Sequence, residues 1–273
     1  MDDKNITDRD RQAASHQSLF DGVVFDRMET YDASKLNCLT FYESGRVRVG
    51  INLPLANRRS GYPFLLCGRI YTNSELAYNC GAFSLNTPLH IEKQRKLMEE
   101  RNGFLSRQSA QRHYGEHIRE DWEEFQQQWM FYVIWRKCLG NADFRNLLLS
   151  LPSDAVLILN NTRYRTDADS RSNLTWGTKN DEQKRVDWNL DFNERHYFIL
   201  KPEDWEEVKR KRANIHRVGH FVGQNNMGKI LQMCKIALEN HNIPPIDFEL
   251  LRAKKIYLFG ELVTFENEEY VED

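Results

Sequence analysis

The central part of the sequence reads Trp122-Glu-Glu-Phe-Gln-Gln-Gln-Trp129-Met-Phe-Tyr-Val-Ile-Trp135-Arg-Lys137, and it predicts one long helix. Successive residues of an α-helix are turned by about 100° around its axis. Phe131 and Trp135 therefore lie opposite the main apolar stripe, so the second half of the helix is apolar nearly all round, which is typical of a buried helix. The main stripe itself carries Trp122, Gln126, Trp129, Met130, Val133 and Lys137.

Lys137 is an unusual residue for such a stripe, because an ammonium group is costly to bury. It must extend to solvent, pair with a carboxylate or lose its proton. Loss of the proton would give a nucleophilic amine at neutral pH. Lys137 also lies near the expected end of the helix, where the helix dipole and the last carbonyl groups stabilise a lysine for purely structural reasons. Both interpretations remain open on the sequence alone.

Composition points to a folded protein without a broad basic surface. The chain has 273 residues, of which 40% are hydrophobic and 12% aromatic, enough for a core. The net charge of −2 argues against non-specific binding of duplex nucleic acid. Five scattered cysteines without a Cys-x-x-Cys pair suit reduced thiols, so we expect a cytoplasmic protein with no metal site. The acidic, polar first residues do not resemble a signal peptide.

Apolar clusters and turn residues predict an α+β protein that is predominantly helical. A flexible polar tail is expected over residues 1–17, strands or short helices within 20–42, and strands within 46–71, where Gly and Pro mark turns. Because strands and helices are grouped rather than alternating, a doubly wound sheet is not expected. The other expected elements are a helix from Thr72 with Thr72 and Glu75 as a capping box, helices at 88–101, 116–139, 144–151, 203–213 and 225–238, and strands at 154–159 and 255–265.

Four stretches of the sequence, in a fixed order, carry a family resemblance. They are Tyr71-Thr-Asn-Ser-Glu75-Leu-Ala-Tyr78; the helix with Trp122, Trp129-Met130 and Lys137, which runs on into Asn141-Ala-Asp-Phe-Arg-Asn-Leu-Leu-Leu149; Leu174-Thr-Trp176-Gly177; and Asn225-Asn-Met-Gly228-Lys229-Ile-Leu. In order and spacing they resemble the NADAR family of YbiA-like N-glycosidases, in which the Trp-Gly turn follows a strand. The resemblance covers about residues 41–240. It implies one NADAR-like domain over 18–250 with a long insertion at 178–224, followed by a C-terminal strand and acidic tail at 251–273.

The resemblance implies a hydrolase that removes ADP-ribose from the exocyclic amine of guanine in nucleic acid. Such an enzyme would reverse DNA ADP-ribosylation and act as an antitoxin toward a DNA ADP-ribosyltransferase toxin. The expected partner is thus ADP-ribosylated guanine in DNA, in a single strand or at an end, with no cofactor and no membrane. Two alternatives stay open. One is a non-catalytic module that binds ADP-ribose or NAD derivatives, and the other is an N-glycosidase of riboflavin-pathway intermediates.

The resemblance also suggests a role for individual residues. A neutral Lys137 would form a Schiff base with ribose C1, and Glu75 would transfer protons. Trp122 and Trp176 would stack on bases, although core packing is an alternative for Trp122. Pyrophosphate would lie at the helix start formed by Asn225, Gly228 and Lys229, where the alternatives are a simple N-cap and a close helix contact. Asn57 and Arg69 are further candidates for ribose or phosphate contacts.

The sequence departs from the family pattern at three places. Asn173 stands where the family often has Asp, and Ala82-Phe83 stands where a lysine is common. The 178–224 stretch is longer than the usual connection. It carries basic clusters that either form a solvated face or hold a nucleic-acid strand, at Lys184-Arg185 and Lys209-Arg-Lys-Arg212, with Trp188 and Trp205 available for stacking.

Overall fold

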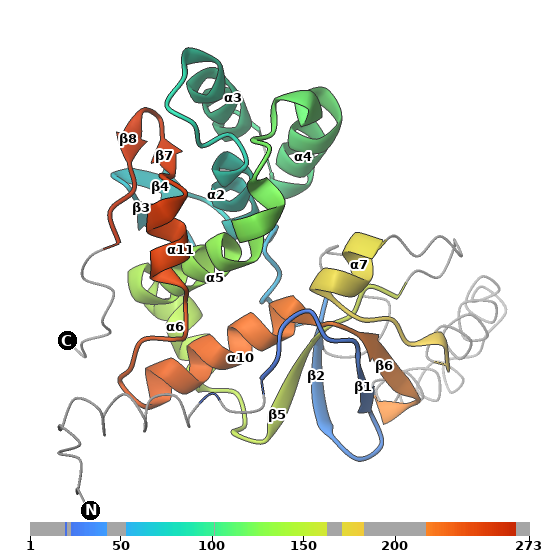
Figure 1. Ribbon diagram of the computed structural model, residues 1–273. Helices are drawn as coiled ribbons and strands as arrows, with labels where there is room; N and C mark the ends of the chain where they lie inside the picture. Colours follow the sequence, from blue (N-terminus) through green and yellow to red (C-terminus); the bar gives the residue numbers. More distant parts are fainter. Residues whose placement is uncertain are drawn as a thin grey trace, which may run out of the picture. The chain divides into compact units, whose positions relative to one another are not determined.

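Helices and short two-stranded sheets form a mixed α+β fold, as the sequence predicts. The computed structural model describes residues 20, 23–42, 53–100, 102–162, 171–182 and 217–265. The helices are α2 (Ser74–Gly81), α3 (Pro88–Met98), α4 (Gly103–Gln108), a π-helical turn (Ser109–His113), a 3-10 turn (Gly115–His117), α5 (Trp122–Gly140), α6 (Ala142–Leu149), α7 (Arg171–Trp176), α10 (Asn226–Glu239) and α11 (Phe248–Ala253). The strands are β1 (Glu29–Asp32), β2 (Asn37–Phe41), β3 (Phe64–Leu66), β4 (Arg69–Tyr71), β5 (Ala155–Leu159), β6 (His220–Gly223), β7 (Tyr257–Leu258) and β8 (Glu261–Leu262), as Figure 1 shows.

The chain divides into two compact units. The helical unit comprises Tyr62–Leu149 and Met233–Asp273 together with Met1–Val24, and the sheet unit comprises Phe25–Gly61 and Ser150–Gln232. One passage of the chain between the units therefore falls between Gly61 and Tyr62. The ranges 1–17, 18–250 and 251–273 expected from the sequence describe contiguous stretches of chain, and they remain a prediction.

Helix α5 is the centre of the helical unit. Every side chain from Trp129 to Trp135 is buried, and so are Lys137 and Cys138. Helices α2, α6 and α11 and strand β3 pack against it (Figure 1). The predicted burial on all sides is thus confirmed, whereas the predicted start near residue 116 is wrong. The chain from 115 to 117 forms a 3-10 turn, and extended backbone at Ile118 separates that turn from α5.

Helix α2 begins at Ser74 and differs from the predicted capping box. Its N-cap is Asn73, whose side chain accepts a hydrogen bond from the Leu76 N–H at 3.1 Å. Glu75 is therefore the second helical residue, whereas the carboxylate of a capping box stands at the third. The capping-box role of Glu75 with Thr72 is thus corrected, and another reason is needed for a carboxylate at this buried position.

Helices α2 and α5 approach each other closely because Gly81 has no side chain. A Cβ atom at Gly81 would lie 2.1 Å from Nε1 of Trp129. The same indole N–H donates a hydrogen bond to the Ala77 carbonyl at 3.2 Å. A buried indole nitrogen requires such a partner, so this contact fixes the position of Trp129 between the two helices.

Two tight hairpins complete the helical unit. The β3–β4 turn at Cys67–Gly68 and the β7–β8 turn at Phe259–Gly260 have positive φ at both central residues, which is the pattern of a type I′ turn. Gln94 of α3 is fully buried, and its Oε1 accepts a hydrogen bond from the Phe259 N–H at 2.5 Å. The second hairpin replaces the single strand that the sequence predicted at 255–265.

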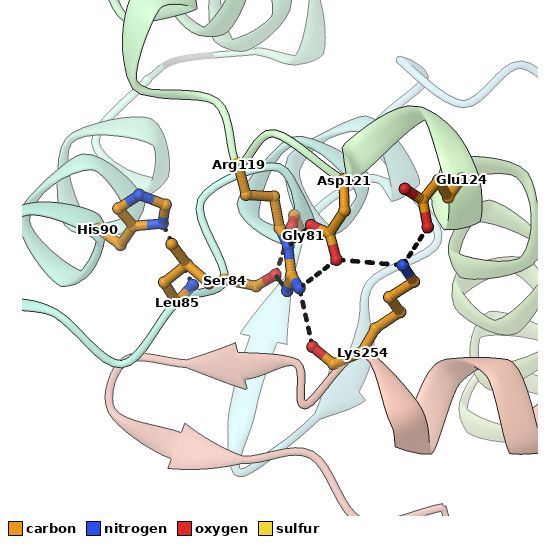
Figure 2. A network of polar contacts seen from close by, with 8 residues as sticks. All are labelled: Gly81, Ser84, Leu85, His90, Arg119, Asp121, Glu124 and Lys254. Carbon is orange, nitrogen blue, oxygen red and sulfur yellow. Dashed lines mark hydrogen bonds and ion pairs between the residues drawn. The ribbon is translucent and has the colours of Figure 1, made fainter.

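Arg119 makes the main polar cross-link of the helical unit, shown in Figure 2. Its side chain is nearly buried, and its guanidinium donates to both carboxylate oxygens of Asp121, at 2.6 and 3.0 Å. It also donates to Oγ of Ser84 at 2.9 Å and to the Lys254 carbonyl at 2.8 Å. Ser84 follows α2, Asp121 precedes α5 and Lys254 follows α11, so one side chain connects the ends of three helices.

The sheet unit contains one parallel and one antiparallel pair of strands. Strands β2 and β5 are parallel, with Asn37 opposite Ala155 and Phe41 opposite Leu159. Strands β1 and β6 are antiparallel. Their shared core contains Ala33, Cys38, Ile158 and Phe221, with Tyr31 and Val156 packed against it.

Most of the remaining predicted elements occur with small shifts. The helices at 88–98 and 226–239 and the strand at 155–159 are confirmed. Helix α6 begins two residues earlier than expected, because the side chain of Asn141 accepts a hydrogen bond from the Phe144 N–H at 2.9 Å. The Trp176-Gly177 step lies at the end of helix α7 and not after a strand. The basic helix predicted at 203–213 lies outside the described residues.

Replacing Arg119 with alanine is expected to lower the free energy of unfolding by about 2–4 kcal/mol. The variant leaves the buried Ser84 hydroxyl and the Lys254 carbonyl without their donor. Chemical denaturation measures the loss. The Lys254→Met variant is the control, because it removes the ion pairs with Glu124 and Asp121 but keeps the backbone carbonyl. Equal losses in the two variants would contradict the role given to Arg119.

Candidate functional site

The side chain of Lys137 is completely buried in the helical unit. Its Nζ lies 4.0 Å from the centre of the Phe144 ring and 5.3 Å from the centre of the Tyr62 ring. Those two rings also contact each other, with centres 5.4 Å apart. Among the described residues Nζ makes no hydrogen bond. The amine is thus enclosed by aromatic rings instead of by acceptors.

The end of α5 does not use Lys137 as a cap. The last carbonyls of the helix, those of Cys138 and Leu139, each accept a hydrogen bond from Nη1 of Arg145 at 3.2 Å. Arg145 belongs to the next helix, α6, and it supplies the cation that the helix C-terminus favours. The structural explanation from the sequence, a lysine bonded to the last carbonyls, is therefore wrong for Lys137.

Burial lowers the pKa of Lys137 from 10.5 to about 7, because a charged amine loses its hydration there; the neighbouring Cys138 raises it slightly. Aromatic faces attract a cation, but they replace only part of that hydration. With a pKa near 7, about half of the molecules carry a neutral amine at pH 7. The site therefore contains a nucleophile that an ordinary surface lysine does not provide.

Glu75 is the second candidate catalytic residue, and it is also buried, with 3% of its surface exposed. It lies in the first turn of α2, and α2 packs directly against α5, the helix that carries Lys137. The first turn of a helix stabilises a carboxylate through the helix dipole. Both candidate catalytic side chains therefore come from packed helices of the same unit.

Trp122, the first residue of α5, is nearly buried. Its ring contacts those of Tyr78 and Phe125, each with a centre-to-centre distance of 5.1 Å. Both of these rings belong to the helical unit, so packing in the core accounts for the position of Trp122. Trp176, at the end of α7 in the sheet unit, is half-buried.

Asn225 has a structural role in the sheet unit that the sequence did not predict. Its backbone is left-handed, with φ of 53°, and its side chain is bonded to strand β5. The amide nitrogen donates to the Leu157 carbonyl at 2.8 Å, and the amide oxygen accepts from the Leu159 N–H at 3.1 Å. The side chain thus imitates a neighbouring strand rather than capping α10.

Gly228 and Lys229 also make close contacts in the sheet unit. A Cβ atom at Gly228 would lie 2.0 Å from the Leu157 carbonyl oxygen, so α10 can approach β5 only with glycine here. Lys229 is nearly buried, and its Nζ pairs with Glu29 at 3.0 Å. Glu29 in turn accepts a hydrogen bond from the Tyr31 hydroxyl at 2.5 Å. The predicted pyrophosphate site therefore contains residues that already serve packing and charge pairing.

The remaining candidate binding residues belong to different units. Asn57 is buried in the sheet unit. Arg69 is exposed on β4 of the helical unit, with its guanidinium 4.0 Å above the ring of Phe259. The side chain of Asn173 and the basic and aromatic residues at 184–212 lie outside the described residues.

Comparisons of the chain with protein-family models, with curated proteins and with solved structures find no match. The resemblance to the NADAR family therefore rests on the four sequence stretches. Within the described ranges, no group of three or more His, Cys, Asp or Glu residues is arranged to hold a metal ion. No described helix is long and apolar enough to cross a membrane.

Sequence reasoning did not identify the two rings around the Lys137 amine. Phe144 follows a helix break at Asn141, so helical periodicity cannot relate it to Lys137. Tyr62 lies more than 70 residues before Lys137, in a Gly-Tyr-Pro sequence that signals only a turn. The aromatic character of both residues was the one available signal.

Replacing Lys137 with methionine is expected to stabilise the protein at neutral pH. The folded-state pKa is about 7 and the unfolded value 10.5, so between these values the unfolded chain binds more protons and wild-type stability rises with pH. The gain at pH 7 is on the order of several kcal/mol, since each pKa unit corresponds to about 1.4 kcal/mol. Denaturation of both proteins from pH 7 to 10.5 should show the difference shrinking. A constant difference would contradict a desolvated amine.

Replacing Gly228 with alanine is expected to destabilise the protein by more than about 3 kcal/mol, because the new Cβ overlaps a backbone oxygen. The matched control is Gly115→Ala, whose Cβ meets no atom within 4 Å, and its effect should stay within about 0.5 kcal/mol. Thermal unfolding measures both. If Gly228→Ala keeps full stability and loses only affinity for ADP-ribose, the glycine serves a phosphate and not packing.

Proposed function

We propose that this protein is an N-glycosidase that removes ADP-ribose from the exocyclic amine of guanine in nucleic acid, with Lys137 as nucleophile. The observation that carries the proposal is the buried Lys137 amine, which has no hydrogen-bond acceptor among the described residues and a pKa lowered to about 7 by burial. A lysine of this kind reduces stability, so a chemical use is a reason to keep it. The type of reaction is taken from the resemblance of the four sequence stretches to the NADAR family.

The reaction needs a neutral amine. When the ribose ring oxygen is protonated, the N-glycoside opens to an iminium in which C1 remains bonded to the guanine nitrogen. The Lys137 amine adds to C1, and the guanine nitrogen takes a proton and leaves, so the sugar is held as a Schiff base. Water then adds to C1 and the lysine nitrogen leaves. The net products are ADP-ribose and an unmodified guanine that stays in the nucleic acid, with one water consumed, and no pair of carboxylates is needed.

Glu75 is the proposed acid and base of this reaction. Three proton transfers are required: to the ring oxygen, to the departing guanine nitrogen and from the attacking water. A carboxyl group in a mostly buried position can carry them in turn. Its place on α2, the helix packed against α5, supports the assignment, as does the loss of the capping-box explanation.

The nucleic-acid part of the proposal rests on the family resemblance. It includes DNA carrying the modified guanine as substrate, in a single strand or at an end, and a functional link to a DNA ADP-ribosyltransferase toxin. Trp122 and Trp176 remain the proposed stacking residues, and Asn225, Gly228, Lys229, Asn57 and Arg69 the proposed sugar and phosphate contacts. The proposed domain is a single NADAR-like one, and the proposed setting is the cytoplasm.

The direct test is turnover of an oligonucleotide that carries ADP-ribosylated guanine. Wild-type protein should release ADP-ribose, which chromatography separates from the oligonucleotide. Lys137→Ala should abolish release, and Glu75→Gln should reduce the rate roughly 10²–10⁴-fold, the usual contribution of a general acid or base. Borohydride added during turnover should attach ADP-ribose to Lys137, as mass spectrometry of the peptide would reveal.

Lys35→Ala is the control, since this lysine is 80% exposed and pairs with the nearby Asp32. Its activity should equal that of wild type. Full activity of Lys137→Ala would exclude the lysine mechanism. Tight ADP-ribose binding in calorimetry without turnover would instead favour the binding module, and preferred cleavage of a ribosylated riboflavin intermediate in a competition assay would favour the metabolic enzyme.

A further inference from the structure

We propose that Tyr62 is a positioning residue whose ring covers the Lys137 amine and must move aside before a carbonyl carbon can reach it. This inference rests on the proposed function, because it concerns access to the same nucleophile. The burial of Lys137 requires such a movement, because a completely buried amine cannot attack a sugar unless one of its neighbours opens a path.

Tyr62 is the neighbour that can open this path. Lys137 and Phe144 are both fully buried, whereas Tyr62 is only half-buried, so of these three side chains it alone reaches the surface. The Tyr62 ring lies against both others, 5.3 Å from Nζ and 5.4 Å from the Phe144 ring centre. Phe144 therefore forms the inner wall of the enclosure and Tyr62 the outer one.

The backbone around Tyr62 has one free side and one fixed side. Gly61 is exposed, has a φ of +116°, and would meet no atom within 4 Å if it carried a Cβ. Such a φ is open to glycine and rarely to other residues. On the other side, the Pro63 carbonyl accepts a hydrogen bond from the amide nitrogen of Asn141 at 2.8 Å. The backbone on the Gly61 side is thus unobstructed by neighbouring atoms, while Pro63 stays attached at the end of α5.

The covering ring has two chemical consequences. When it is closed, it excludes water and so keeps the amine poorly solvated, which favours the neutral form. When it is open, the amine that was kept neutral can react with its substrate directly. A phenylalanine would cover the amine equally well, since the contact is made by the ring face. A small side chain would leave the amine open to solution.

Reductive methylation tests this without any glycoside. Formaldehyde forms an imine with a neutral amine as water leaves, and cyanoborohydride then delivers hydride to give the methylated amine. Mass spectrometry compares methylation of Lys137 with that of Lys35, the exposed reference in the same molecule. Because exposure also raises the pKa of Lys137, methylation is followed as a function of pH and each rate is expressed per neutral amine. On this basis the rate at Lys137 relative to Lys35 should rise roughly tenfold in Tyr62→Ala, as expected when a partly buried ring is removed. In Tyr62→Phe it should stay within about twofold of wild type.

Phe144→Leu separates covering from general loosening. Leucine is smaller than phenylalanine, so this change leaves more space on the inner side of the amine and keeps Tyr62 in place. Lys137 should therefore be methylated at about the wild-type rate. Thermal unfolding verifies that each variant is folded before it is compared. The proposal is overturned if folded Tyr62→Ala reacts like wild type, if Tyr62→Phe reacts like Tyr62→Ala, or if Phe144→Leu accelerates methylation as much as Tyr62→Ala.

The outcome is independent of the proposed enzyme activity. If methylation follows the expected order and no ADP-ribose is released from any substrate, the covering role of Tyr62 stands and the glycosidase proposal fails. If ADP-ribose release depends on Lys137 while Tyr62→Ala changes no methylation rate, the glycosidase stands and the covering role fails.

Discussion

Burial of the second half of α5 on all sides is the constraint to which the helical unit conforms. A helical segment without a polar face has to be covered along its whole circumference, and helices α2, α6 and α11 and strand β3 pack against α5. The contacts are close, since Gly81 admits the indole of Trp129 where any Cβ would collide. Interiors packed to this density leave a polar group no water to bond. Lys137, near the end of this helix, is placed where its ammonium group loses hydration without gaining an acceptor from any described residue.

Two other buried cations of the described chain differ from Lys137 in their partners. Arg119 donates hydrogen bonds to the Asp121 carboxylate, a hydroxyl and a carbonyl (Figure 2), and Lys229 forms an ion pair with Glu29. In both cases the cost of desolvation is offset by charge-assisted hydrogen bonds. Lys137 receives only the faces of Tyr62 and Phe144. The described residues thus include paired cations that hold elements together, and also Lys137, whose pKa is lowered by burial so that the neutral form required by the proposed reaction is available.

Much of the fold follows from local signals. Helix periodicity located α3, α5 and α10, and a continuous apolar run located β5, because burial imposes these patterns on the sequence directly. The errors lie at element ends. Asn73 rather than Thr72 caps α2, and the strand expected at 255–265 bends into a hairpin at Phe259–Gly260. Such ends depend on which of several adjacent polar residues finds its backbone partner, and that choice is made by packing.

For the candidate site, the sequence by itself determined that Lys137 lies on a buried helix face. It also marked Glu75 as a carboxylate at a helix start, because both follow from residue type and a period of 3.6. Only the tertiary structure decided that Arg145 takes the last carbonyls of α5, that two rings enclose the amine, and that Asn225 bonds β5 instead of capping α10. Those contacts join side chains across helix breaks or long stretches of chain. A local sequence pattern cannot predict such contacts, because they depend on the way whole helices and strands pack.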